Sequence, residues 1–330
     1  MVSARSAVSG AIVAGAVVAA SVAFVTPTLA GPGSANNKDK GSSHPIVESV
    51  YTDEIADYGV CRGVDPSCYN DWGAGWEEGE QKRVLIWSRT AGPRHAHLGT
   101  ALAPGLNPPL NANNVAQANL KAWLEEEGVQ VDYTEDLGQF RPNNYNAVVF
   151  LSSNRDTLDD TAQTALKQYV RRGGGFVGIH NAFGAEYSFE YYEGLLGGAN
   201  FYDHGPNREG TVETVNSQDA STEALPPRWT FTDEWYNLVP YPSYVNVLAQ
   251  VDSATSTRPE GTNGHPGHGA LGEAHPVSWC HYYDGGRSWL TTLGHDVKAW
   301  TSDSLQGDVE FKEHVVQGTL SAMGVEEFCQ

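Results

Sequence analysis

Three histidines and one glutamate supply the residue types that transfer protons or hold metal ions: His95, His180, His295 and Glu234. Histidine is the side chain best suited to proton transfer near neutral pH, and a glutamate beside it can orient it or act as a base. Imidazoles together with a carboxylate could equally hold a divalent metal ion. A single histidine is more often an ordinary polar group at a strand end, so the prediction depends on these four residues being brought together.

Their positions along the chain indicate that they meet. Each of the four lies at the end of a predicted strand or in the loop after it, and these strands are 84–87, 176–179, 229–236 and 287–293. Sites in open α/β sheets form in the crevice beyond the carboxyl ends of the strands. We therefore expect the four side chains to converge at one edge of a sheet.

The first part of the chain alternates apolar runs with helical stretches. Helices are predicted at 113–127 and 157–172, among apolar runs at 84–87, 129–133, 147–151 and 176–179. This alternation indicates right-handed crossovers and a parallel sheet with helices on both faces. Later strands are more frequent, with a hairpin signal at Asp284-Gly285-Gly286 and a last helix at 308–323. The predicted fold is a doubly wound, mainly parallel α/β sheet with an added antiparallel hairpin.

The amino-terminal residues have the order of a secretory signal peptide. Arg5 is the one charged residue among the first thirty, and it precedes an Ala/Val-rich run and a small-residue ending, Thr28-Leu29-Ala30. The apolar run, residues 11–25, is shorter than the ~20 residues of a membrane-spanning helix. We expect cleavage after Ala30 and a secreted protein. Residues 31–43 are then a flexible leader, 44–80 an accessory segment, and 81–325 the α/β domain.

The mature chain is strongly acidic. Without residues 1–30 it has 19 basic and 40 acidic residues, so its formal charge is 19 − 40 = −21. Such a surface repels phosphate backbones and anionic lipid headgroups. We therefore expect no nucleic-acid partner, and no membrane partner after signal cleavage.

The four cysteines belong to an oxidising compartment if the chain is secreted. Cys61 and Cys68 lie close together in a Gly/Pro/Asp-rich stretch, which predicts a disulfide that closes a small loop. Cys280 and Cys329 could pair, or Cys280 could be a buried free thiol.

Other motifs exclude some chemistries and favour sugar binding. The sequence has no G-x-S-x-G elbow, and the residue after the fourth strand is His180, not a Ser or Cys nucleophile. Nine Trp and fifteen Tyr are numerous, and flat aromatic faces suit sugar rings as well as core packing. Tyr236 and Trp279 are near the expected site.

Several segments, in order, resemble the ThuA-like (trehalose utilisation) family over about residues 83–324. They are Thr90-Ala91-Gly92-Pro93-Arg94-His95, Ala147-Val148-Val149-Phe150-Leu151-Ser152, Gly173-Gly174-Gly175-Phe176-Val177-Gly178-Ile179-His180, Thr232-Asp233-Glu234-Trp235-Tyr236, His275-Pro276-Val277-Ser278-Trp279-Cys280-His281 and Gly285-Gly286-Arg287 through Gly294-His295. The resemblance implies a flavodoxin-like, class I glutamine amidotransferase-like fold. It excludes amidotransferase activity, because the Cys nucleophile is absent at the elbow position.

The resemblance also implies a role in sugar metabolism, with hydrolysis of 3-keto-disaccharides as the activity. By motif it places His95, His180, Glu234 and His295 at the catalytic site, with His204, Trp279 and Arg287 around them as substrate-binding side chains. Tyr236, as an aromatic residue near the site, is a further substrate-binding candidate. Pro93, Asn181 and the segment 44–80 depart from the family pattern.

The expected function is that of a secreted carbohydrate-active enzyme that cleaves a glycosidic linkage by His/Glu acid/base chemistry. In a 3-keto-glycoside, His180 or Glu234 would abstract the acidified C2 proton and His95 would protonate the leaving oxygen. Arg287 or a bound divalent metal would stabilise the enolate. The alternatives are a polysaccharide lyase acting on a uronic acid and a non-catalytic carbohydrate-binding protein.

Overall fold

A computed structural model describes residues 59–256 and 275–330. The predicted signal peptide (1–30), the leader (31–43) and residues 44–58 of the accessory segment lie outside the described residues. None of the described helices is long and apolar enough to cross a membrane.

Five strands form the parallel half of the main sheet, in the order β3-β2-β4-β5-β12. Their bounds are β2 Arg83–Trp87, β3 Gln130–Thr134, β4 Ala147–Leu151, β5 Gly175–Ile179 and β12 Gly286–Thr291. Numbered along the chain this is the order 2-1-3-4-5, one of the common orders of doubly wound sheets. β4 is buried at every position because helices cover both faces. The predicted mixed α/β class with parallel strands is confirmed.

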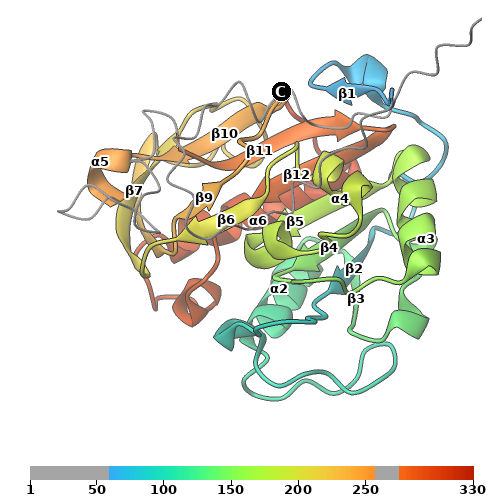
Figure 1. Cartoon of the computed structure of the whole chain (residues 1–330), viewed down its shortest axis with the longest axis horizontal. Helices are drawn as coiled ribbons and strands as arrows, with labels where there is room; N and C mark the ends of the chain where they lie inside the picture. Colours follow the sequence, from blue (N-terminus) through green and yellow to red (C-terminus); the bar gives the residue numbers. More distant parts are fainter. Residues whose placement is uncertain (1–58, 257–274) are drawn as a thin grey trace, which may run out of the picture. The chain divides into compact units, whose positions relative to one another are not determined.

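Side-chain alternation along β2 shows how the two faces are covered. Val84 and Ile86 belong to the core that includes residues of α2 (Val115–Glu126) and α6 (Asp308–Met323). Leu85 and Trp87 belong to the core on the other face, with α3 (Asp160–Arg171) and α4 (Glu190–Leu195). Because a strand side chain points to alternate faces, one apolar run anchors both layers. Figure 1 shows the helices around this half of the sheet.

The antiparallel part is larger than the single hairpin that the sequence predicts. The hairpin is present, since β11 (Pro276–Tyr283) pairs with β12 through Asp284 and Gly285, both with positive φ as a type I′ turn requires. The sheet then continues through three further antiparallel strands, which are β10 (Asn246–Val251), β7 (Arg208–Thr214) and β8 (Arg228–Asp233). These strands occupy the other half of the sheet from β2–β5 (Figure 1).

The predicted strand 229–236 is in fact two strands. β8 ends at Asp233, and β9 (Tyr236–Leu238) pairs with β6 (Phe201–His204) in a separate two-stranded sheet. The break leaves Glu234 and Trp235 between the two strands, outside any regular ladder.

The described part of the accessory segment, residues 59–80, packs at the amino ends of the parallel strands. β1 (Arg62–Gly63) pairs with β11, and the backbone N–H of Asn70 donates a hydrogen bond to the Gly285 carbonyl, 2.9 Å away. A 3-10 turn at Pro66–Cys68 carries one end of the Cys61–Cys68 disulfide, which confirms the predicted pairing.

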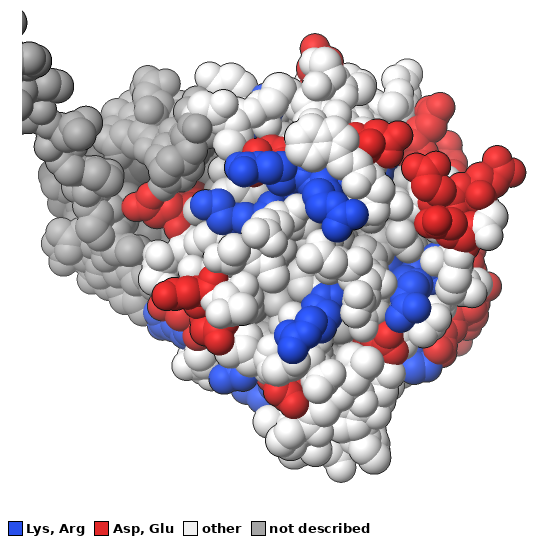
Figure 2. Space-filling model, turned by 90° about the vertical axis from the view of Figure 1, so that its right-hand side faces the viewer, with Lys and Arg blue, Asp and Glu red and all other residues white. Residues whose placement is uncertain are grey.

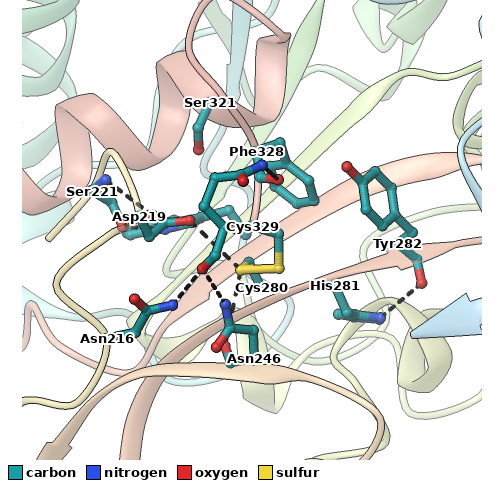
Figure 3. The surroundings of a disulfide bond; sticks show 12 residues. Asn216, Asp219, Ser221, Asn246, Cys280, His281, Tyr282, Ser321, Phe328 and Cys329 are labelled. Atoms are coloured by element: carbon teal, nitrogen blue, oxygen red, sulfur yellow. Dashed lines mark hydrogen bonds between the residues drawn. A yellow bond between two sulfur atoms is a disulfide. The ribbon is translucent and has the colours of Figure 1, made fainter. Parts of the chain in front are cut away.

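A second disulfide joins Cys280 on β11 to Cys329, so the pairing alternative holds and Cys280 is not a free thiol. Figure 3 shows Asn216 and Asn246 beside this bond. Both amides donate hydrogen bonds to the Gln330 carbonyl oxygen, the Asn246 bond at 2.7 Å. The segment after α6 is thereby fixed to β11 by a covalent bond, and by hydrogen bonds to the start of β10 and to the loop after β7.

The acidic surplus is not spread evenly. Figure 2 shows a face on which Lys and Arg side chains lie near the middle and Asp and Glu side chains gather toward one edge. The net charge of the chain therefore does not describe the charge of each face. That the protein has no nucleic-acid or membrane partner stays a prediction.

Candidate functional site

A cavity of about 240 Å³ opens where the loops after β2, β4, β5, β8 and β12 meet. Its lining residues include His95, His204, Glu234, Tyr236 and His295. His180 is fully buried behind this lining. The cavity thus lies at the edge of the sheet where strand topology predicts a site.

The four predicted catalytic residues come together there. Their donor atoms, one from each of His95, His180, Glu234 and His295, all lie within 4.8 Å of one another. His295 Nδ1 is 2.9 Å from Glu234 Oε2 and 3.3 Å from His180 Nε2, and the rings of His95 and His180 are 4.7 Å apart. Four residues separated by up to 200 positions in sequence form one cluster.

His180 begins a 3-10 turn directly after β5, with a left-handed φ of 51°. Its Nδ1–H donates to the Thr292 carbonyl at 2.8 Å, which leaves Nε2 as an acceptor facing the cluster. The Tyr236 hydroxyl, 3.0 Å away, donates to that nitrogen. Burial, reinforced by the neighbouring histidines, holds the pKa of His180 well below its usual range. This imidazole is therefore neutral, fixed in one tautomer and fixed in orientation.

Asp233, the last residue of β8, ties Glu234 to His295. Its carboxylate accepts backbone N–H bonds from Glu234 at 2.8 Å, from Gly294 at 2.7 Å and from His295 at 3.2 Å. Three strands separate β8 from β12 in the sheet, so this contact connects parts of the sheet that are not neighbours. Burial raises the pKa of Asp233 to about 7, against the opposing effect of its hydrogen bonds.

The pKa values of His295 and His95 are shifted in opposite directions although both side chains line the cavity. Burial opposes the charged form of His295, but the hydrogen bond and charge of Glu234 outweigh it and raise the pKa of His295. Burial and the nearby His295 lower the pKa of His95 to about 4. The cavity wall therefore presents one imidazole that favours the protonated form and one that favours the neutral form.

His97 supports the cluster from the interior, a role that the sequence did not assign to it. Its Nδ1–H donates to the His295 carbonyl at 2.9 Å, and its Nε2 accepts from the Ser152 hydroxyl at 2.8 Å. Burial lowers the pKa of His97 to about 3. The sequence could have indicated this role, because His97 follows His95 by two residues in the same loop after β2.

The four predicted substrate-binding residues divide into two groups. His204 and Tyr236 line the cavity, and His204 Nε2 lies 3.5 Å from Glu234 Oε2. Trp279 does not line it, because it lies in the middle of β11, is fully buried and donates to the Leu196 carbonyl at 3.0 Å. The sequence prediction for Trp279 is corrected accordingly.

Arg287 also lies away from the cavity. It is near the start of β12, at the amino end of the strand, whereas the cavity is reached beyond the carboxyl end. Its guanidinium lies 3.9 Å from the ring centroid of Tyr69, in the accessory segment. The predicted role of Arg287 at the site, including stabilisation of an enolate, is therefore wrong, and its position indicates an anchor for that segment.

The structure adds lining residues that the sequence prediction missed: Asn154, Arg155, Asn181 and Tyr187. Asn154 and Arg155 follow β4, whose carboxyl end carries the polar run Ser152-Ser153-Asn154-Arg155. The strand-end rule that selected the histidines would also have selected this run. Ser152, Arg155 and His180 all have positive φ without being glycine, and such strained backbone clusters at functional sites.

The cluster can do two kinds of chemistry. Imidazoles whose pKa values are shifted in opposite directions, beside a carboxylate, can take and give protons. The same nitrogen and oxygen donors fit a divalent transition metal, and the His180 Nδ1–H bond to a carbonyl is the anchoring that metal-ligating histidines usually have.

Comparisons with known proteins give the family. A sequence model of the ThuA family, described as trehalose utilisation, matches residues 83–320. A ThuA-like protein structure from Parabacteroides merdae ATCC 43184 is similar, with 17% identity, a TM-score of 0.56 and coverage of 76% of this chain and 92% of that chain. Another from Bacteroides uniformis ATCC 8492 has 20% identity, a TM-score of 0.54 and coverage of 76% and 95%. None of the curated proteins matches the sequence.

At these identities the solved structures support a shared fold, and the sequence match gives the membership. Because that match spans residues 83–320 of the 330-residue chain, the protein belongs to the ThuA family.

Proposed function

We propose that this protein is a secreted carbohydrate-active enzyme that cleaves a glycosidic linkage of a keto-sugar, by acid/base chemistry at the His/Glu cluster. The observation that carries the proposal is the convergence of His95, His180, Glu234 and His295 at one cavity. A purely carbohydrate-binding protein has no need of four proton-transferring groups within 4.8 Å of one another. Membership of a family described as trehalose utilisation supports a sugar substrate.

The geometry favours Glu234 over His180 as the base. Glu234 lines the cavity and can reach a substrate, whereas His180 is buried behind it and contacts His295 and Tyr236. His180 is therefore a positioning residue for its neighbours. His95 and His295 line the cavity and are the candidates for the acid.

The reaction follows from the acidity of carbons next to a ketone. A C3 carbonyl acidifies the C2 proton, and Glu234 takes that proton as the enolate forms. The bond from C1 to the glycosidic oxygen then breaks, and a cavity histidine gives the leaving oxygen a proton. Addition of water to the resulting double bond completes hydrolysis, whereas release of the unsaturated sugar would make the enzyme a lyase.

If the cluster instead holds a divalent metal, the three histidines and Glu234 would be its ligands, and the ion would supply Lewis-acid polarisation of the keto oxygen in place of proton abstraction by Glu234. Asn181, which lines the cavity, offers a side-chain N–H donor to the same oxygen.

The test is an assay of 3-keto-disaccharides that measures release of free sugar by the wild type and by Glu234→Gln. Loss of a general base costs roughly 100- to 10,000-fold in rate, so we expect a loss in that range. Glu127→Gln, an exposed carboxylate at the end of α2, is the matched control and should keep full activity. Full activity of Glu234→Gln, or no cleavage of keto-disaccharides by the wild type, would overturn the proposal.

A further inference from the structure

Arg155 is a cavity residue that the proposed chemistry does not use. It lies in the loop after β4 and lines the same cavity as the His/Glu cluster. Its backbone is fixed on both sides, since its N–H donates to the Gly184 carbonyl at 2.8 Å and its carbonyl accepts from the Glu186 N–H at 3.1 Å. The left-handed φ of 59° is maintained by these bonds. The backbone from which this exposed side chain extends is thus set by the fold.

The loop that carries Arg155 is fixed by a second buried residue. Glu186 accepts hydrogen bonds from the Thr157 amide and hydroxyl, both at 2.7 Å, and from the Leu158 amide at 3.1 Å. Since Glu186 is only 1% exposed, these bonds hold the start of α3 and the end of the Arg155 loop together. A rigid loop is what precise placement of a binding group requires.

The side chain of Arg155 extends over a glycine. A Cβ on Gly92 would lie 2.6 Å from Arg155 Cγ, so only glycine leaves room for this path. The guanidinium lies 5.7 Å from the ring centroid of Tyr187, another lining residue. The aromatic ring supports the cation without neutralising it.

Within residues 59–256 and 275–330, the Arg155 guanidinium has no carboxylate partner and no hydrogen-bond acceptor. Other arginines of this chain are paired, for example Arg94 with Glu135 at 2.7 Å and Arg171 with Asp284 at 2.9 Å. The carboxylate of the cavity, Glu234, is already in contact with His295 and His204. Although the chain has twice as many acids as bases, no acid among the described residues neutralises Arg155 at the cavity.

We infer that Arg155 binds a carboxylate of the substrate, so that the cavity takes an acidic saccharide with a uronic or aldonic acid unit. The planar guanidinium matches a carboxylate with two parallel hydrogen bonds, which makes it selective for this group over a sugar hydroxyl. The inference rests on the proposed function only in taking the occupant of the cavity to be a sugar.

The test measures binding and does not depend on turnover. Isothermal titration calorimetry on the full mature chain compares methyl glucuronide with methyl glucoside, which differ only at C6. Hydrogen bonds to charged groups are worth roughly tenfold to 100-fold in affinity, so we expect the wild type to prefer the glucuronide by that factor. Arg155→Gln should abolish the preference and Arg155→Lys should keep part of it. Arg172→Gln, an exposed arginine just after α3, is the matched control.

Each outcome separates the two proposals. Equal affinity for the two sugars, binding of neither, or an equal loss in Arg172→Gln overturns the role of Arg155. A preference that Arg155→Gln removes supports it, even where the wild type cleaves no keto-disaccharide and the proposed function fails. Conversely, the wild type could cleave neutral keto-disaccharides and yet bind the glucuronide no better than the glucoside. That result would support the proposed function and overturn the role of Arg155.

Discussion

Replacing Asp233 by asparagine should loosen the loop after β12 that carries His295, while leaving the size of the side chain unchanged. One oxygen of Asp233 accepts the N–H groups of Glu234 and His295, and the other accepts that of Gly294 at 2.7 Å. An asparagine oxygen can keep the first two bonds. Its NH₂ group would then face the Gly294 N–H, donor against donor, and the loop after β12 would move away.

The expected destabilisation can be worked out from these bonds. A lost hydrogen bond to a charged acceptor costs roughly 1.5–3 kcal/mol, and a buried N–H without a partner costs ~1–3 kcal/mol more. These two costs sum to roughly 2.5–6 kcal/mol. Asparagine also removes a buried charge: because the pKa of Asp233 is raised to about 7, ionisation at pH 8 costs the folded state about 4 kcal/mol. We therefore expect the free energy of unfolding of Asp233→Asn to fall by at most about 2 kcal/mol at pH 8. Asp233→Ala, which orphans all three N–H groups, should lose more. A displacement of about 1 Å at the reacting groups would cost turnover ~100-fold.

Urea denaturation followed by tryptophan fluorescence measures the first effect, and the keto-disaccharide assay measures the second in folded protein. Asp159→Asn is the matched control, because Asp159 caps α3 by accepting the Ala162 N–H at 2.9 Å and asparagine caps equally well. If Asp233→Asn unfolds at the wild-type urea concentration and keeps its turnover, Asp233 does not tether the loop.

Three further outcomes follow from described residues. Zn²⁺ should inhibit cleavage and a chelator should restore it, because the ion would bind the four acid/base donor atoms that lie within 4.8 Å of one another. Activation by Zn²⁺ would instead show that the cluster is a metal site. Burial lowers the pKa of His314 to about 4, so neutral His314 stabilises the fold fully above pH 6.5, and this stabilisation, about 3 kcal/mol, is lost as the pH falls toward 4. The free energy of unfolding of His314→Gln, measured by urea denaturation, should therefore fall less steeply between pH 6.5 and pH 4 than that of the wild type. The same fall in both proteins would contradict this. Replacing Cys280 and Cys329 by serine should lower the free energy of unfolding by about 4 kcal/mol, from a sequence separation of 49, and by more than loss of the other disulfide, with its separation of 7. Equal losses in urea denaturation would refute the loop-length argument.

The parallel half of the fold could be predicted because a run of apolar residues indicates both a buried strand and the edge of the sheet at which that strand ends. A run such as Ala147–Leu151, apolar at every residue, is typical of a strand covered on both faces, and β4 has those bounds. All strands of a parallel sheet end at the same edge. Placing His180 after such a strand therefore places it at the site, and no distance information is needed.

The antiparallel half could not be predicted in the same way. Neighbouring antiparallel strands end at opposite edges, so the sequence alone does not say which edge a residue such as Trp279 approaches. Arg287 is a different kind of error. It starts a strand, and the strand-end rule would have placed it at the far edge, where the structure has it beside Tyr69.

The interruption between β8 and β9 explains why the strand prediction failed at the residues that matter most. In a regular strand Asp233 and Trp235 would point to the same face, with Glu234 opposite. Here Asp233 binds the loop after β12, while Trp235 is buried against β7, where a Cβ on Gly210 would lie 2.7 Å from its ring. Glu234 is held between these two fixed residues and reaches His295 at 2.9 Å. The break between β8 and β9 frees Glu234 from a sheet ladder, and the fixed residues on either side hold its carboxylate beside the histidines.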